Sequence, residues 1–238
     1  MIFRQCSIGG KVYTSDSSPI TQSTTGSTTK EGPATTTTSS DTEKPPQDVD
    51  EDTGFHSSEL EQDLQAALSA DSQSENAGHA RALNGFMTVL ALCHTVLTSL
   101  NPDTGKIEYK AQSPDEAALV QAAADAGYVF KGKDRDILTL ERPDSDGKVQ
   151  EERYELLNVL EFNSSRKRMS VVMRKLDEDG PGKVILLAKG ADNVIFERLK
   201  EGPDQALKDQ TELHLSEFAN NGLRTLTLAY KVIPSEPI

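Results

Sequence analysis

The sequence predicts an α+β domain in which a twisted antiparallel β-sheet is flanked by helices. Segments of strand length follow one another between residues 128 and 188, and a Gly- and Pro-containing turn at 177–182 joins two of them closely enough to predict antiparallel pairing. Near the end of the chain, residues 223–232 alternate apolar and polar side chains, as a half-buried strand does. Segments of helix-forming residues lie before and after these strands.

The first element in order is a hairpin over residues 2–13. Its two strands, Ile2–Ile8 and Lys11–Tyr13, are separated by Gly9-Gly10, a pair that tolerates the positive φ angles of a two-residue turn. Residues 14–80 then form a predicted insertion that is mostly disordered, because Thr24–Ser40 is almost wholly Ser, Thr, Gly and Pro and cannot bury enough apolar area to offset its ordering entropy. Apolar residues near its end are spaced for one short helix: Leu60, Leu64, Ala67 and Leu68.

Two helices are predicted next. Arg81–Ser99 is apolar on most faces and predicts a buried helix, in which His94 is a core or helix-end histidine. A second helix begins at Ser113, the expected N-cap, with Pro114 at the first helical position and Glu116 closing a capping box. Its Ala-rich face predicts close packing on something flat, a sheet.

Further strands and helices complete the prediction. One strand precedes the second helix, five follow it and one ends the chain. Two more helices lie between the last two strands. The strands are expected at Ile107–Lys110, Tyr128–Phe130, Ile137–Leu140, Tyr154–Phe162, Met169–Leu176, Val184–Ala188 and Leu223–Val232, and the helices after Asp192 and at Gln205–Asn220.

Length and composition predict a single soluble domain. With 238 residues we expect one domain, 1–238, with the insertion 14–80 inside it. Cys6 and Cys93 are too far apart in sequence to suggest a metal site or a disulfide framework, and neither a signal peptide nor a membrane-spanning segment is predicted. The isolated chain is therefore expected to be soluble and monomeric.

The charge of the chain is concentrated in one segment. The formal net charge of -13 argues against nucleic acid as a partner. Residues 41–63 hold nine acidic residues against the single Lys44, a net charge of -8, so the remainder can still form a local basic pocket. The segment itself is open to two interpretations, a regulatory tail phosphorylated on Ser or Thr, or a neutral surface insertion.

The stretch from Glu161 to Ser170 combines features that a folding core does not require. Phe162 ends an apolar run and is followed by hydroxyl groups and three consecutive cations, Arg166, Lys167 and Arg168. An aromatic face beside positive charge suits a ligand with a flat ring and a phosphate tail. The alternative is a hairpin edge that its cations keep soluble. The chain has neither a Walker A nor a G-x-G-x-x-G motif, so a nucleotide would be bound by side chains.

Four motifs, taken in order, closely resemble the nucleotide-binding domain of P-type ATPases. They are Ser113-Pro114-Asp115-Glu116-Ala117-Ala118-Leu119-Val120, Phe162-Asn163-Ser164-Ser165-Arg166-Lys167-Arg168-Met169-Ser170, Lys189-Gly190-Ala191-Asp192 and Gly222-Leu223-Arg224-Thr225-Leu226. Ala91-Leu92-Cys93-His94-Thr95-Val96 and Gln112 before Ser113 look like the type IV branch, the phospholipid flippases. The resemblance covers residues 1–13 and about 80–238.

The resemblance implies a set of ATP-binding residues. Phe162 matches the aromatic that stacks on adenine, and Glu116 matches a carboxylate near the adenine edge. Lys189, in one motif with Gly190, matches the lysine deep in the adenosine pocket. The other matches are Ser164 and Lys167, which line the nucleotide, and Arg224 and Thr225, which reach the phosphates. From the residues alone, Glu116 remains open between a helix cap and a ligand contact, Thr225 between a phosphate contact and a sheet residue, and Arg166 and Arg168 are interpreted as surface charges.

The sequence also departs from the complete family pattern. It lacks Asp-Lys-Thr-Gly-Thr, the motif of the phosphorylated aspartate, so no catalytic residue or metal ligand is expected in it. The resemblance therefore implies the cytosolic domain of an integral membrane protein of the plasma membrane or Golgi and endosomal membranes. This domain would present ATP to the phosphorylation domain of an ATP-driven phospholipid translocase, in which Mg²⁺ is bound mainly outside this chain.

The implied partners are the phosphorylation and actuator domains, the membrane domain with its phospholipid substrate, and an accessory subunit. The isolated chain is expected to bind nucleotide without turnover. The alternative function is a regulatory or protein-interaction module that keeps the fold and acts through the acidic insertion. A free-standing kinase or hydrolase would need a catalytic base or metal set, and the sequence shows none.

Overall fold

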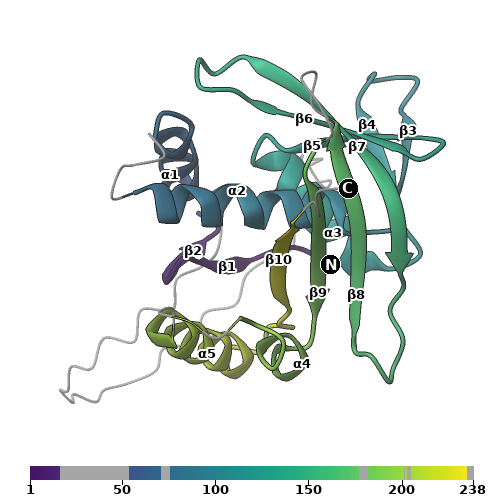
Figure 1. Ribbon diagram of the computed structural model, residues 1–238. Helices are drawn as coiled ribbons and strands as arrows, with labels where there is room; N and C mark the ends of the chain where they lie inside the picture. Colours follow the sequence, from purple (N-terminus) through teal and green to yellow (C-terminus); the bar gives the residue numbers. More distant parts are fainter. Residues whose placement is uncertain (17–53, 71–75, 177–181, 201, 203–204, 235–238) are drawn as a thin grey trace, which may run out of the picture.

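A six-stranded antiparallel sheet forms the frame of the domain, in the strand order β10-β9-β8-β7-β6-β5 (Figure 1). The computed structural model describes residues 1–16, 54–70, 76–176, 182–200, 202 and 205–234. The strands are β1 Gln5–Ile8, β2 Lys11–Thr14, β3 Leu97–Leu100, β4 Ile107–Lys110, β5 Val129–Asp134, β6 Ile137–Pro143, β7 Val149–Leu160, β8 Arg168–Leu176, β9 Val184–Gly190 and β10 Thr227–Ile233. The helices are α1 Ser58–Leu68, α2 Ala77–Leu92, α3 Pro114–Asp125, α4 Asp192–Phe196 and α5 Gln205–Asn220.

The predicted fold class is confirmed: the sheet is antiparallel and helices flank it. The predicted pairing of β8 with β9 is also confirmed, although most of the turn between them, residues 177–181, lies outside the described residues. The N-terminal hairpin forms with φ of 59° at Gly9 and 85° at Gly10, the two positive angles that a two-residue turn of this hand requires.

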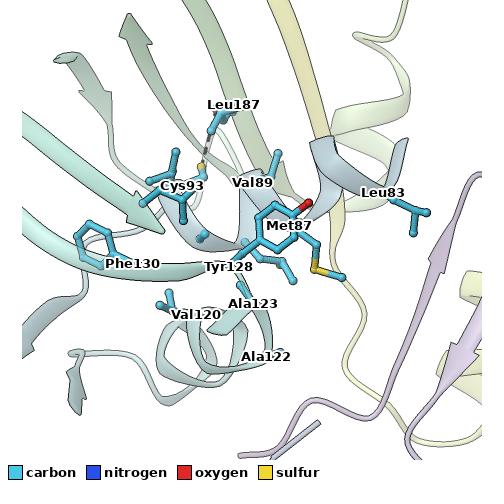
Figure 2. Close-up of a cluster of buried hydrophobic side chains, with 14 of the residues drawn as sticks. Leu83, Met87, Val89, Cys93, Val120, Ala122, Ala123, Tyr128, Phe130 and Leu187 are labelled. Carbon is cyan, nitrogen blue, oxygen red and sulfur yellow. Dashed lines mark hydrogen bonds between the residues drawn. The ribbon is translucent and has the colours of Figure 1, made fainter. Parts of the chain in front are cut away.

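Helix α2 lies against one face of the sheet and also packs on α3 (Figures 1 and 2). Figure 2 shows the shared core, in which α2 contributes Leu83 and Met87, α3 contributes Val120, and β5 with the residue before it contributes Phe130 and Tyr128. The Ala-rich face of α3 was expected to pack on a sheet. It packs on β5 of the sheet and on β4, and it packs on α2 as well, a partner that was not expected.

Helix α2 ends earlier than predicted. The expected helix ran to Ser99, but α2 stops at Leu92, and residues 97–100 form β3. The His94 ring explains the break, because its Nε2 donates to the Ala91 carbonyl over 2.8 Å and its Nδ1 accepts from the Val96 N–H over 3.0 Å. These bonds satisfy main-chain groups that a continuing helix would otherwise pair. His94 is thus a helix-end histidine, and burial lowers its pKa to about 4.

Both cysteines are buried and unpaired, as the sequence predicted. Cys93 lies at the end of α2 and points its Sγ toward the Leu187 carbonyl of β9, 3.8 Å away (Figure 2). Burial raises the pKa of the Cys93 thiol to about 12, so it remains protonated at neutral pH. We therefore assign it a packing role between α2 and the sheet.

The last strand also differs from the prediction in its start. It was expected to begin at Leu223, but β10 begins at Thr227. Gly222, at φ 75°, ends α5, and the following Leu223 N–H donates to the Phe218 carbonyl, so these residues complete the helix end. Residues 223–226 are therefore a loop between α5 and β10, and this loop carries Arg224.

Part of the predicted insertion 14–80 belongs to the folded domain. The short helix expected there is confirmed as α1, which buries Leu60 and Leu64 against the core, and Phe55 packs edge-on against Phe3 with ring centroids 4.8 Å apart. The folded part of the insertion therefore extends beyond the expected helix, because Phe55 before it also packs against the core. Residues 17–53 and 71–75, and with them most of the acidic segment on which the interaction-module alternative depends, lie outside the described residues.

Candidate functional site

The end of the sheet where β7 turns into β8 carries Phe162 at its surface. The ring belongs to the loop directly after β7 and is 63% exposed, although it is a large apolar side chain. It is therefore not a core residue, the role that the sequence disfavoured. A large aromatic ring that remains exposed on the surface can stack against a flat ligand.

The turn that follows Phe162 is closed by its own residues. Lys167 N–H donates to the Asn163 carbonyl over 2.8 Å, and Lys167 has a left-handed φ of 49°. Arg166 N–H donates to the Asn163 side-chain oxygen, also over 2.8 Å. Ser164 lies exposed within this turn. The turn thus has a defined shape that displays Phe162, Ser164 and Lys167 together.

Gly190 joins this turn to the end of β9. It pairs with Arg168 across the sheet, and the next residue, Ala191, donates its N–H to the Lys167 carbonyl over 3.0 Å. A Cβ atom at position 190 would lie 2.6 Å from the Lys167 carbonyl oxygen and 2.8 Å from the Arg168 Cα. Only glycine fits there, because those neighbours are main-chain atoms and cannot rotate away.

We therefore expect Gly190→Ala to destabilise the domain by at least about 1–3 kcal/mol, the usual cost of overpacking. Urea unfolding at pH 7 measures this loss. Gly202→Ala is the matched control, because a Cβ atom there meets nothing within 4 Å. Equal stability of the Gly190→Ala variant and the control would contradict the close packing of β9 on the turn.

Lys189 and Glu116 form a buried ion pair beside this turn. Lys189 Nζ lies 2.7 Å from Glu116 Oε1, and the two side chains are 10% and 15% exposed. β9 delivers the lysine from the sheet, and the first turn of α3 delivers the carboxylate. Although Lys189 lies at the end of its strand, its side chain is therefore not a solvent-exposed strand end.

Thr95 completes the setting of Glu116. Its N–H and its hydroxyl both donate to Glu116 Oε2, over 3.2 and 2.9 Å. Burial alone would raise the pKa of Glu116, but the hydrogen bonds from Lys189 and Thr95 and the charge of Lys189 outweigh it, so the pKa is lowered. Glu116 does not close the predicted capping box, because its carboxylate turns away from Ser113 to these partners.

Arg224 contacts the start of α3 through Asp115. Its Nη1 is 2.9 Å from Asp115 Oδ2, while its side chain remains 76% exposed. The loop after α5 is thereby held next to the residue that precedes Glu116. Thr225 follows in the same loop and is half-buried.

The structure therefore connects most of the residues predicted for the site. Glu116, Lys189, Gly190 and Lys167 are joined by direct contacts or by adjacent residues, and Phe162 and Ser164 belong to the Lys167 turn. Arg224 is linked through Asp115. Two hollows open elsewhere on the described surface, one beside α1 and one beside the N-terminus, and neither is lined by a predicted site residue. The Phe162 ring gives the candidate site an exposed face at one end of the sheet.

Sequence reasoning missed three residues of this arrangement. Thr95 and Asp115 lie inside motifs that were recognised, but nothing in their spacing shows that they bind Glu116 and Arg224. Arg166 was interpreted as a surface charge, and it does lie at the surface, but its contacts with main-chain carbonyls were not foreseen. It is half-buried, and its guanidinium donates to the carbonyls of Leu160 and Glu161.

Comparison with known proteins shows the family of the chain. The profile of the family described as "P-type ATPase, cytoplasmic domain N" matches residues 82–238. The chain is 46% identical over 155 residues, 65% of its length, to probable phospholipid-transporting ATPase 11 of Arabidopsis thaliana. It is 43% identical over 188 residues, 76% of its length, to phospholipid-transporting ATPase DNF1 of Saccharomyces cerevisiae, and 40% identical over 191 residues, 79% of its length, to phospholipid-transporting ATPase C887.12 of Schizosaccharomyces pombe.

The matched region is a small part of each relative. It spans 12% of the Arabidopsis protein, 11% of the Saccharomyces protein and 14% of the Schizosaccharomyces protein. In the described part of this chain, none of the helices has the length and apolar character needed to cross a membrane. The chain therefore belongs to the family of P-type ATPase cytoplasmic N domains, on its type IV branch.

Proposed function

We propose that this domain binds ATP by its adenosine part and presents the γ-phosphate to the phosphorylation domain of a phospholipid-translocating ATPase. The observation that carries the proposal is the exposed Phe162 ring at the same sheet end as the buried Lys189–Glu116 pair. The phospholipid substrate is proposed from the names of the relatives, which are phospholipid-transporting ATPases. The site residues remain proposals in the same way.

Each proposed contact has a matching chemical group. Adenine would stack on Phe162, a contact that is worth about 1–3 kcal/mol for any base. The Glu116 carboxylate has about four acceptor positions, of which Lys189 and the two Thr95 groups use three, so one remains for the exocyclic amine of adenine. The Lys189 ammonium keeps two of its three hydrogens for the nucleotide.

The phosphate end of the nucleotide would meet Arg224. Its guanidinium uses Nη1 for Asp115, and its exposure leaves the remaining donors free to bind phosphate oxygens in a fork. Lys167 adds a further exposed cation from the turn. Together these cations would direct the phosphate chain away from the adenine face and outward from the domain.

The chemistry of phosphoryl transfer is assigned to the parent protein. Among the described residues, no group of three or more His, Cys, Asp or Glu is placed to hold a metal ion. Positioning and electrostatic stabilisation supply most of the catalysis in phosphoryl transfer. The isolated domain would contribute the positioning of ATP and is expected to bind nucleotide without turnover.

We expect Phe162→Ala to weaken ATP binding about 5- to 150-fold, because the variant loses the stacking face. Titration of ATP by isothermal calorimetry against both proteins measures the change. Leu213→Ala is the control, since Leu213 is 66% exposed but belongs to α5. Equal ATP affinity of wild type and Phe162→Ala would exclude the stacking role, and absence of binding by the wild type would exclude the proposed function itself.

A further inference from the structure

The Arg166 side chain bends back over the turn that its own backbone helps to form. Its Nη1 donates to the Leu160 carbonyl over 2.9 Å and to the Glu161 carbonyl over 2.8 Å. Both hydrogens of one nitrogen are thus used on consecutive main-chain oxygens. The second of these carbonyls belongs to the peptide bond that leads into Phe162, so the guanidinium holds the main chain directly before the ring.

The Phe162 ring has few other constraints. At 63% exposure it lacks the packing that fixes a core aromatic, and its direction therefore depends on the main chain that carries it. That main chain is held on one side by Arg166 and on the other by the turn closed between Asn163 and Lys167. When the ring is already held in place, binding does not have to order it. The entropy cost of binding is then smaller and the affinity higher than for a mobile ring.

We propose that Arg166 is a positioning residue for the nucleotide site, which holds Phe162 in the orientation that accepts adenine. This inference rests on the proposed function, because it concerns the same site. Arg166 acts through the main chain before the ring, and its two hydrogen bonds to carbonyl oxygens turn Nη1 away from a phosphate. The neighbouring Arg168 makes one bond within the turn, from its Nη1 to the Arg166 carbonyl over 3.2 Å, and does not reach the residues before Phe162 in this way.

The first test needs no ligand. The chain contains no tryptophan, so Phe162→Trp introduces a single fluorescent reporter at the position of interest. In that background, Arg166→Gln is expected to lower the steady-state anisotropy of the indole and to raise its quenching by acrylamide, because the main chain before it is released. Arg168→Gln removes the same charge from the same turn and is expected to leave both signals unchanged. Arg166→Lys should restore most of the anisotropy, since an ammonium can donate to both carbonyls.

The second test separates positioning from phosphate binding. Arg166→Gln is expected to weaken adenosine and ATP by the same factor, about fivefold, because both ligands stack on Phe162. The same substitution in a Phe162→Ala background should then change neither affinity further, since a positioning residue acts only through the ring. Arg168→Gln should leave adenosine binding unchanged. Melting temperatures of all variants show that the fold is retained.

The outcomes separate this inference from the proposed function. Unchanged anisotropy in the Arg166→Gln reporter would overturn the positioning role, whatever the nucleotide affinity. A loss of ATP affinity with adenosine unaffected would make Arg166 a phosphate contact, and unfolding of Arg166→Gln would make its role purely structural; either result overturns the inference. If the wild type binds neither ligand, the proposed function and the nucleotide part of this inference fail together, while the anisotropy still decides whether Arg166 holds the main chain.

Discussion

Lys189→Met is expected to destabilise the domain by about 3 kcal/mol at pH 7, the low end of the cost of removing one partner from a buried ion pair. The substitution keeps the length of the side chain but leaves the Glu116 carboxylate buried with only the Thr95 donors. The low end applies because the Glu116 side chain keeps 15% of its exposure and can recover some hydration. Urea unfolding of wild type and variant measures the difference.

The loss should depend on pH with a defined sign. In the wild type the pKa of Glu116 is lower in the folded state than in the unfolded state. The ionised carboxylate therefore contributes to the stability of the fold above the unfolded pKa, and this contribution is lost as pH falls through the folded pKa. Without Lys189, burial raises the pKa of this carboxyl, and the variant gains stability on acidification as the carboxyl protonates. The difference between the two proteins is therefore largest at neutral pH and shrinks toward pH 4.

Two further variants control this result. Lys183→Met removes an exposed lysine just before β9 and should change stability little. Combining Lys189→Met with Glu116→Gln should recover much of the loss, because the second change removes the unpaired charge. If Lys189→Met alone cost less than about 1 kcal/mol, the pair would not be a buried one in solution.

The second large effect is expected from Glu152→Gln. Glu152 is 6% exposed and accepts from Arg142 Nη2 over 2.8 Å, from Lys175 Nζ over 2.8 Å and from the Tyr154 hydroxyl over 2.6 Å. The neutral amide of glutamine would leave the two cations without their anion, which we expect to destabilise the domain by about 2–3 kcal/mol at pH 7. This cost is lower than that of breaking a fully buried ion pair, because both cations are partly exposed. Thermal or urea unfolding measures this loss.

The pH dependence again gives a sharper test. Burial would raise the pKa of Glu152, but the hydrogen bonds from Arg142, Lys175 and Tyr154 and the Arg142 charge lower it from 4.5 to about 2. The stabilisation is thus fully present above pH 4.5 and is lost as pH falls toward 2. The stability gap between wild type and Glu152→Gln should narrow over that range.

A neighbouring residue serves as the control for Glu152. Glu151 is exposed on the same strand, and Glu151→Gln should leave stability and its acid dependence as in the wild type. Nucleotide affinity should also stay unchanged in Glu152→Gln, since Glu152 lies at the other end of β7 from the Phe162 turn. A stability gap that remains constant down to pH 3 would contradict the assigned pKa.

Local features of the sequence were sufficient for most of the elements. The Gly9-Gly10 pair predicted the hairpin because only residues that adopt positive φ at low cost form such a turn. Apolar spacing predicted α1 and α5, and runs of strand length predicted β5 to β9. The candidate residues came from recognised motifs, since each motif is a continuous stretch that can be read without the fold.

Other features could not be predicted because they depend on contacts between distant residues. The end of α2 is set by the His94 ring, and neither Gly nor Pro marks it. From the sequence Glu116 was open between a helix cap and a ligand contact, but Lys189, which lies 73 residues away, forms an ion pair with it that neither interpretation included. The packing of α3 on α2 could not be predicted either, because the spacing of apolar residues along α3 does not show which apolar surface they pack against.

By itself the sequence determined the antiparallel α+β class, most of the elements and the set of residues proposed to bind nucleotide. These follow from local backbone preferences and from short motifs. Only the tertiary structure decided that Lys189 is paired with Glu116, that Gly190 allows main-chain contact with the Phe162 turn, and that Arg166 binds main-chain carbonyls. The physical reason is that charge pairing and close packing are decided by distance in space, and folding alone brings these residues together.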